Sequence, residues 1–365
     1  MMLKKLLQEK DYLPILTMQN GEAVTKENWP ARRVELQALL EEYSYGKTPK
    51  APTQVRGEVQ KRDELAYAGK AIEEKITITF ETERGSFSFP MELYTPTRVK
   101  NPPVFLHIAF RPVPDRYIPV EEIIDGGFAL AVVCYQDIVN DNHYGDYSDG
   151  LAQYFGVTID RAANEWGKIG MWAYGASRVL DYLLAERKEL DGEKVTVIGH
   201  SRLGKTALWC AALDQRFYGA VSNNSGYGGA ASSKHGEGEG IKDFLRLGSW
   251  DWFCENFKNY AELEDEKPYD QSFLLAMLAP RCLLVNSATE DRGADPKAEF
   301  LTTLHASSVW ELLGEKGLVC PNRMPEAGEL FDEGKVGYFL RSGRHFISRE
   351  DWGAAMRFLK KKFSE

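Results

Sequence analysis

The chain has 365 residues, of which 43% are hydrophobic and 27% are charged. This composition excludes a disordered chain and is sufficient for one large α/β core with a terminal extension. The formal net charge is −9 at pH 7 and there is no long basic run, so nucleic acid is not an expected partner.

The first residues and the cysteines bear on the cellular location. The chain starts Met-Met-Leu-Lys-Lys-Leu-Leu-Gln-Glu-Lys-Asp, where charges interrupt the run before the apolar core of a signal peptide could form. No segment approaches the roughly 18 uncharged apolar residues of a membrane span. The five cysteines are an odd number, and Cys134 and Cys282 lie in apolar strand-like runs, so we expect reduced, mostly buried thiols. These features predict a cytoplasmic protein that does not contact membranes.

The first quarter of the chain changes from a helical to a strand pattern. Residues 1–50 read as helical, with Asn28 as the expected N-cap before Trp29-Pro30 and an amphipathic run from Leu36 to Tyr45. Residues 55–94 alternate between apolar and polar types, which predicts antiparallel strands and hairpins. We therefore expect an N-terminal helical extension followed by the antiparallel edge of a sheet.

Apolar runs without alternation follow and indicate strands that are covered on both faces. Helical patterns separate several of these runs, which predicts an α/β fold with a doubly wound, mostly parallel sheet. The expected organisation is one catalytic domain over residues 51–365, preceded by the helical extension over residues 1–50. The strand runs are 104–110, 128–135, 195–198, 220–221, 282–285 and 336–340, and the helical patterns are 163–190, 297–313 and 351–363.

The segment from Val195 to Thr206 carries the clearest chemical pattern. A β-branched run leads to Gly199-His-Ser-Arg-Leu-Gly204, and an apolar helix follows. This is the layout of a nucleophile elbow, in which Ser201 sits on a tight turn at the carboxyl end of a strand. The N–H groups that begin the next helix can stabilise negative charge there, which predicts acyl chemistry at Ser201. The second glycine falls three residues after the serine instead of two, so Leu203 must adopt a helical φ.

The same residues also fit a phosphate loop, because Gly199, Gly204, Lys205 and Thr206 read as G-x-x-x-x-G-K-T. Phosphate loops favour small residues between their glycines, and no later apolar strand ends in a lone Asp for Mg²⁺. The esterase interpretation is therefore favoured over nucleotide binding and over a purely structural glycine turn.

The expected chain order of serine, acid and histidine selects the general base. Of the six histidines, four precede the late strand that would carry the acid. His305 fits the apolar period of a helix, which indicates packing. His345 lies in a glycine-containing loop between a strand and a helix and is predicted to be the general base. The four excluded residues are His107, His143, His200 and His235.

The acid is expected on the loop that follows the strand starting at Cys282. Asp291 lies where a turn could present a carboxylate to the imidazole, and Glu290 remains the alternative. Asp295 is expected to cap the helix that starts near Pro296.

Four motifs occur in order along the chain, and together they resemble the bacterial glucuronoyl esterases of carbohydrate esterase family fifteen, also described as acetylxylan esterase-like. The resemblance covers most of the chain and implies an α/β-hydrolase fold with Ser201 as nucleophile and His345 as base. It further implies that Arg202 is an oxyanion-hole donor and that Lys205 binds sugar hydroxyls; we expect a second donor near Phe110-Arg111. The motifs are Gly199-His-Ser-Arg-Leu-Gly-Lys205, Ser225-Gly-Tyr-Gly-Gly-Ala-Ala231, Ala279-Pro-Arg281 leading into Glu290-Asp291 and Ala294-Asp-Pro296, and Gly343-Arg-His345.

The chain departs from this family at several positions. Asn224 stands where many members have a catalytic Glu, so the acid must come from the later loop, which favours Asp291. Gly293 replaces a Trp that is common in relatives with uronate activity, and Ser233-Lys234 replaces a frequent Arg-Arg. Glu239, or Glu237 in another register, matches the hydroxyl-binding Glu of the family. Metal binding in the surrounding Gly-rich loop is not expected, because the ligand spacing is wrong.

Taken together, these features predict a serine carboxylic-ester hydrolase that acts on carbohydrate esters, similar to 4-O-methyl-glucuronoyl methylesterases. Its substrate is expected to be a small-molecule or oligosaccharide ester, and no cofactor or metal is expected. An acetyl esterase is the alternative, because the Trp and the Arg-Arg pair are missing. A noncatalytic carbohydrate binder and a nucleotide binder are more distant alternatives. The sequence leaves the oligomeric state open.

Overall fold

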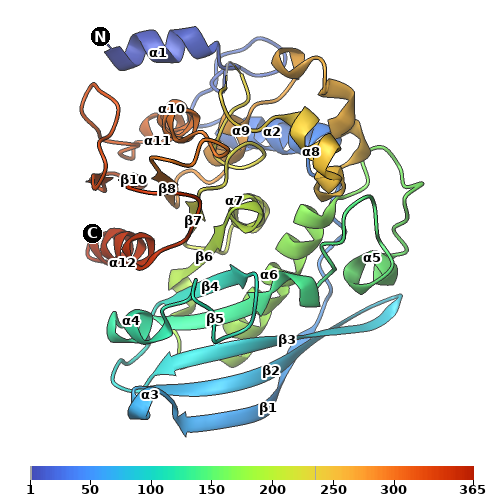
Figure 1. The fold of residues 1–365 in the computed structure, drawn as a ribbon, viewed down its shortest axis with the longest axis vertical. Coiled ribbons are helices and arrows are strands. Elements are labelled where there is room, and N and C mark those ends of the chain that lie inside the picture. The colour runs from blue at the N-terminus through green and yellow to red at the C-terminus, as the bar shows by residue number, and fades with distance from the viewer. Residues whose placement is uncertain (1, 235) are drawn as a thin grey trace.

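The structure is a computed structural model and describes residues 2–234 and 236–365. Within them, ten strands form one sheet in the order β1-β2-β3-β5-β4-β6-β7-β8-β10-β9 (Figure 1). The strands from β5 to β10 in this order pair in parallel, whereas β1, β2, β3 and β9 pair antiparallel. The strands are β1 (Val55–Leu65), β2 (Ala71–Thr82), β3 (Gly85–Pro96), β4 (Val104–Ala109), β5 (Ala129–Cys134), β6 (Val195–His200), β7 (Gly219–Asn223), β8 (Cys282–Ala288), β9 (Leu330–Phe331) and β10 (Val336–Arg341).

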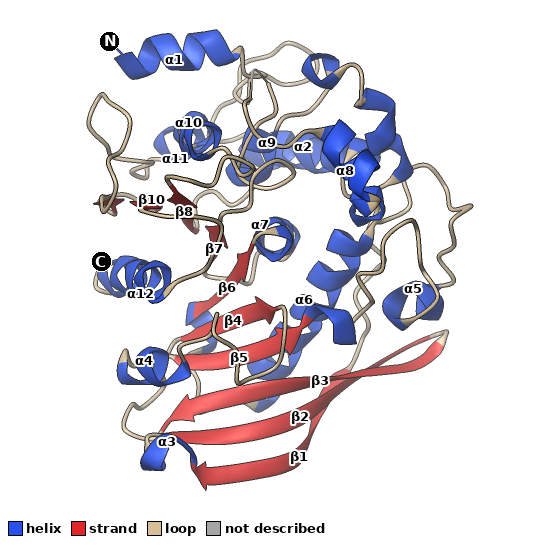
Figure 2. Cartoon of the chain, in the orientation of Figure 1, coloured by secondary structure: helices blue, strands red, loops and turns tan. Residues whose placement is uncertain are grey.

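Helices cover both faces of this sheet (Figure 2). The α-helices of the described residues are α1 (Met2–Lys10), α2 (Trp29–Tyr43), α3 (Ala66–Gly69), α4 (Val120–Asp125), α5 (Gly150–Phe155), α6 (Lys168–Glu186), α7 (Arg202–Leu213), α8 (Ile241–Leu247), α9 (Gln271–Ala276), α10 (Pro296–Ala306), α11 (Ser308–Leu312) and α12 (Arg349–Phe363). Short 3₁₀ helices are η1 (Tyr135–Asp137), η2 (Gly192–Lys194), η3 (Ser249–Trp252), η4 (Glu255–Tyr260) and η5 (Glu264–Glu266). None of the described helices combines the length and apolarity needed to cross a bilayer.

Two hydrophobic cores hold these layers together. Ile123 of α4 and Trp352 of α12 pack in the core on one face, and Trp172 of α6 and Leu208 of α7 pack in the larger core on the other. All four side chains are almost completely buried. The apolar strands are therefore covered on both faces, as their unalternating sequence predicts. The expected α/β-hydrolase architecture is confirmed.

The antiparallel edge also forms as predicted, and the hairpin between β2 and β3 closes at Thr82 and Gly85. The helix expected before Tyr45 is α2, and Asn28 occupies the N-cap position before Trp29-Pro30, as predicted. Asn28 has helical backbone angles and makes no side-chain cap. Its carboxamide oxygen instead accepts a hydrogen bond from the Thr25 N–H at 2.7 Å, which closes a turn before the helix.

The helix predicted over 297–313 is two helices, because α10 ends at Ala306 and α11 begins at Ser308. Asp295 caps α10 as expected and accepts a hydrogen bond from the Ala298 N–H at 2.9 Å. The segment from α8 to η4 and the two-residue strand β9 were not predicted. They are short, and tertiary contacts rather than local periodicity define them.

Parallel strands bring the candidate site residues to one edge of the sheet. Ser201 follows β6, Asn224 follows β7, Asp291 lies three residues after β8, and His345 follows β10. Because β6, β7, β8 and β10 run in the same direction, their carboxyl ends meet at this edge.

Candidate active site

Ser201 occupies a sharp turn between β6 and α7. Its φ of 58° and ψ of −129° are unusual for a residue with a side chain, and such strain is typical of functional positions. Hydrogen bonds on both sides fix the turn, because the Ser201 N–H donates to the Asn223 carbonyl at 2.9 Å and the Gly204 N–H donates to the Ser201 carbonyl at 2.8 Å. Gly199 lacks a Cβ, which would collide with the Leu203 carbonyl. The sequence therefore builds the geometry of a nucleophile elbow.

His345 and Asp291 are in direct contact across 54 residues of sequence. The Nδ1 atom of His345 lies 2.6 Å from Oδ2 of Asp291. The same Oδ2 accepts a hydrogen bond from Nδ2 of Asn224 at 2.8 Å. Asn224, which stands where many relatives have a catalytic Glu, thus holds the carboxylate of Asp291 in place. An imidazole bound through Nδ1 leaves Nε2 available for proton transfer.

The electrostatic setting of Asp291 differs from that of Glu290. Burial opposes ionisation of Asp291, but hydrogen bonds from His345 and Asn224 outweigh it and hold the pKa of this carboxyl below its usual value. Glu290 is exposed and lies 3.5 Å from the Arg344 guanidinium. The geometry therefore brings Asp291, and not Glu290, to the imidazole.

One cavity of about 270 Å³ collects several of the predicted site residues. Ser201, Asp291 and His345 line it together with Lys205 and Glu239. We call it the catalytic cavity. Lys205 comes from the first turns of α7, and Glu239 comes from the loop before α8. Five of the residues predicted from separate motifs therefore share a single concave site.

Lys205 is a buried cation that lines this cavity. Only 3% of its surface is exposed, and its ammonium donates a hydrogen bond to the Ser225 carbonyl. Burial lowers the pKa of Lys205 to about 8, although the nearby carboxylates of Glu239 and Glu299 oppose this shift. The ammonium is therefore charged at neutral pH and has donors left for a ligand.

The two predicted oxyanion-hole residues lie in different settings. Arg202 begins α7, where backbone N–H groups have no partner within the helix. Its guanidinium pairs with Asp141 and lies 4.5 Å from the centre of the Trp252 ring. Arg111 lies on an exposed loop after β4, with its guanidinium 3.9 Å from Asp115. Arg111 does not line the catalytic cavity.

Two supporting groups were not predicted from the sequence. Asp141 accepts hydrogen bonds from Trp252 at 2.7 Å and Tyr135 at 3.0 Å while it pairs with Arg202. Glu299 of α10 is fully buried and accepts a hydrogen bond from the Gly226 N–H at 2.9 Å. Burial raises the pKa of Glu299 to about 7. Neither residue belongs to a local motif, so only the fold reveals these contacts.

The other described histidines have packing roles or surface positions. His200 bonds Asn223 at 2.6 Å, and burial together with the neighbouring His345 lowers the pKa of His200 to about 3. His305 stacks on Tyr12 with ring centres 4.6 Å apart, as its helical period predicts. His107 is buried, His143 lies near Tyr144, and His235 lies outside the described residues. Among the described residues, no cluster of His, Cys, Asp and Glu is suited to a metal ion.

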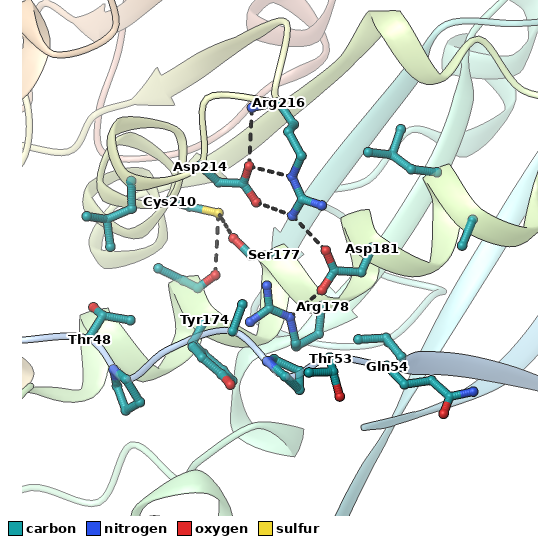
Figure 3. Close-up of a pocket in the computed structure, with 18 of the residues that line it drawn as sticks. Thr48, Thr53, Gln54, Tyr174, Ser177, Arg178, Asp181, Cys210, Asp214 and Arg216 are labelled. Carbon is teal, nitrogen blue, oxygen red and sulfur yellow. Dashed lines mark hydrogen bonds and ion pairs between the residues drawn. The ribbon is translucent and has the colours of Figure 1, made fainter. Parts of the chain in front are cut away.

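A larger cavity of about 1060 Å³ lies at the far ends of α6 and α7 and is shown in Figure 3. Both of its arginines are paired with aspartates: Arg178 lies 2.6 Å from Asp181, and Arg216 lies 2.7 Å from Asp214. Its thiol, Cys210, is 1% exposed, and burial raises the pKa of Cys210 to about 12. This cavity therefore offers no activated nucleophile.

Comparison with known proteins places this site in a family. Residues 76–314 match the family model described as "Glucuronyl esterase, fungi". The chain is 34% identical to carbohydrate esterase MZ0003 of an unknown prokaryotic organism, over 94% of this chain and 87% of the relative. It is 29% identical to the 4-O-methyl-glucuronoyl methylesterase of Cerrena unicolor, over 82% of this chain and 61% of that protein.

The fold gives the same result. A glucuronoyl esterase structure from Solibacter usitatus superposes with a TM-score of 0.88 at 33% identity, covering 96% of this chain and 98% of that one. A family model that spans more than half of the chain, a relative above 30% identity and a shared fold agree. The chain belongs to the glucuronoyl esterases of carbohydrate esterase family 15.

Proposed function

We propose that this chain, a carbohydrate-ester hydrolase by family, cleaves esters of 4-O-methyl-glucuronic acid with Ser201, His345 and Asp291 as its catalytic triad. The single observation that carries the proposal is the hydrogen bond between His345 and Asp291 at 2.6 Å, in a cavity that Ser201 also lines. The relatives named as glucuronoyl methylesterases support the choice of acyl group.

In the first half of the reaction, Oγ of Ser201 attacks the ester carbonyl carbon and its proton passes to Nε2 of His345. Asp291 holds the imidazole in the required tautomer and stabilises its positive charge. The N–H group of Arg202 at the start of α7 donates to the oxyanion. When the tetrahedral intermediate collapses, the alcohol leaves with the proton from His345 and the uronoyl group stays on Ser201.

In the second half, water attacks the acyl carbon and gives a proton to His345. Collapse releases the uronic acid and returns a proton to Ser201. Throughout both steps Lys205 and Glu239 bind hydroxyl groups of the sugar ring, because both side chains line the cavity beside Ser201. Arg111 makes no contribution in this scheme, since its guanidinium lies beside Asp115 on an exposed loop.

A specific observation favours deacetylation as the second candidate. Gly293 lines the catalytic cavity without a side chain, so no aromatic surface at this position stacks on a sugar ring. A small acetyl group needs no such surface. In that reaction the acetyl group would stay on Ser201 and the sugar would leave first.

The test is a paired hydrolysis assay on methyl 4-O-methyl-glucuronate and on an acetylated xylo-oligosaccharide, with Ser201→Ala protein as the blank. The proposal predicts turnover of the uronate ester that disappears in the variant. Turnover of the acetyl ester alone would replace the proposed substrate by the second candidate. Equal hydrolysis by Ser201→Ala protein would contradict the mechanism itself.

A further inference from the structure

The imidazole of His345 is much more exposed than the carboxylate that holds it. The side chain of His345 is 46% exposed, whereas that of Asp291 is 6% exposed. The hydrogen bond to Asp291 fixes the position of Nδ1, but the ring can still turn about that bond. Proton transfer from Ser201 requires Nε2 within hydrogen-bond reach of Oγ. A second contact on the ring is therefore needed to fix the direction of Nε2.

His200, the last residue of β6, makes such a contact. The ring centres of His200 and His345 lie 4.5 Å apart, with the ring planes inclined by 41°. His200 itself is only 2% exposed. The rings of Tyr117 and Phe110 lie 5.6 Å and 6.1 Å from its ring. The half-exposed imidazole of His345 therefore packs on a side chain that is enclosed by its own neighbours.

Asn223 at the end of β7 ties His200 to the turn that carries the nucleophile. Nδ1 of His200 donates a hydrogen bond to Oδ1 of Asn223 at 2.6 Å. The Ser201 N–H donates to the backbone carbonyl of the same residue at 2.9 Å. His200 and Asn223 are also opposite each other in the parallel pairing of β6 with β7. The sheet thus fixes the ring of His200 relative to Ser201.

The ring of His200 stays uncharged while His345 gains and loses a proton. Burial, together with the neighbouring His345, lowers the pKa of His200 to about 3. A second charged ring at this distance would repel the imidazolium that His345 becomes when it takes the proton of Ser201. A neutral ring can remain in contact with His345 in both of its protonation states.

We propose that His200 is a positioning residue for the general base, whose ring holds the imidazole of His345 so that Nε2 points at Ser201. This inference rests on the proposed function, because it takes His345 as the base. It goes beyond that function by giving a role to the residue that precedes the nucleophile. His200 does not line the catalytic cavity, so it acts through His345 and not on the substrate.

Two substitutions separate the ring contact from the hydrogen bond to Asn223. His200→Asn removes the ring and keeps a polar group where Nδ1 lies, and His200→Phe keeps a ring and loses the hydrogen bond. The measurements are kcat and KM for methyl 4-O-methyl-glucuronate, the rate at which a fluorophosphonate modifies Ser201, and thermal melting.

His107 of β4 offers a matched control. It is 3% exposed, its Nδ1 lies 3.3 Å from the Ile198 carbonyl, and its ring packs on Trp352 with the ring centres 5.2 Å apart. His107→Asn therefore removes a similarly buried ring from the same sheet. It should lower the melting temperature and leave kcat unchanged.

His200→Asn should lower kcat and the phosphonylation rate about 10- to 100-fold, with KM within about threefold of the wild-type value, because the base is misplaced while the substrate site is intact. His200→Phe should restore most of both rates. An unchanged kcat in His200→Asn would overturn the inference. Equal losses in His200→Asn and His200→Phe, or in His200→Asn and His107→Asn, would also overturn it, because the ring contact would then not be the cause.

A measurement on the wild-type protein does not depend on how the variants fold. In histidine-labelled protein, nuclear Overhauser effects between the rings of His200 and His345 should be present both below and above the pH at which His345 titrates. Their absence in either state would contradict the inference. Phosphonylation of His345→Ala protein tests the proposed function separately, because a wild-type rate there would remove His345 as the base.

Discussion

The catalytic cavity and the larger cavity at the far ends of α6 and α7 contain similar kinds of side chain. They differ in how these side chains are paired and buried. Each has a hydroxyl or thiol group, Ser201 in one and Cys210 in the other, and each has carboxylates and cations. Both draw residues from α7, a helix of 12 residues that is about 18 Å long. They therefore sit at opposite ends of one element.

The two cavities differ in the ion pairs and hydrogen bonds that their charged side chains make. In the larger cavity both arginines are paired with aspartates, and the thiol of Cys210 is buried (Figure 3). In the catalytic cavity Asp291 is hydrogen-bonded to His345. Lys205 and Glu239 also line this cavity and keep hydrogen-bonding capacity for a ligand. The volume of a cavity is thus a poor guide to function here. Charged groups that keep hydrogen-bonding capacity beside a strained serine are a better guide.

The strongest expected contrast is between the two nucleophilic groups. Ser201→Ala should lower kcat/KM for the uronate ester by several orders of magnitude, because the acyl acceptor is lost. Cys210→Ala should leave kcat/KM unchanged and cost stability only, on the order of 1 kcal/mol. Steady-state kinetics and thermal melting of both variants measure this. A comparable loss of activity in Cys210→Ala would remove the distinction between the cavities.

The next contrast is between adjacent carboxylates. Asp291→Asn should lower kcat about 10⁴-fold, because a neutral amide cannot hold the imidazole tautomer or stabilise its charge. Glu290→Gln should change kcat less than about threefold, since its carboxylate pairs with an exposed arginine. If Glu290→Gln were the damaging change, the acid would be assigned to the wrong residue.

Lys205 offers a smaller effect that depends on pH. Lys205→Met should raise KM about 10- to 100-fold, the loss of a charged hydrogen bond to the sugar. Because the pKa of Lys205 is about 8, wild-type KM should rise as pH passes above about 8, and Lys205→Arg should not show this rise. In the larger cavity, Arg216→Met should leave KM unchanged at every pH. A flat KM profile for the wild type would show that the ammonium does not contact substrate.

Glu299 should affect the free energy of unfolding and not the kinetics. Its pKa is raised from 4.5 to about 7 in the folded protein, so the folded state binds more protons than the unfolded state between these values. Its contribution to stability is therefore fully present below about pH 4.5 and is lost as pH rises toward 7. Glu299→Gln should flatten this decline, by at most about 3 kcal/mol, in denaturant unfolding at pH 5 and pH 7. Parallel declines in both proteins would show that Glu299 is not the titrating group.

The parts of the site that depend on local sequence were predictable. The run from Val195 to Thr206 encodes strand, turn and helix within itself, so Ser201 and α7 could be placed without the fold. His345 followed from chain order, because the late strand and its glycine-containing loop are also local patterns. The parallel sheet followed from apolar runs that do not alternate.

The remaining parts depend on contacts between distant segments. Asp291 and Glu290 are adjacent carboxylates of similar chemistry. Which of them contacts the imidazole is decided by the loop that carries His345, 54 residues away in the sequence. The support that Asn224 gives Asp291 and the burial of Glu299 arise in the same way. Asn28 takes the predicted N-cap position, but its side chain closes a turn before the helix instead of bonding the first helical N–H groups, and periodicity cannot distinguish these two uses.

The most direct test of the central claim is to identify the residue that a fluorophosphonate modifies. Labelled protein would be digested and the modified peptide located by mass spectrometry, with Ser201→Ala and Cys210→Ala proteins alongside. The account predicts one phosphonylated residue, Ser201, with no label in Ser201→Ala and full label in Cys210→Ala. Absence of label on the wild type, or label on another residue, would contradict it.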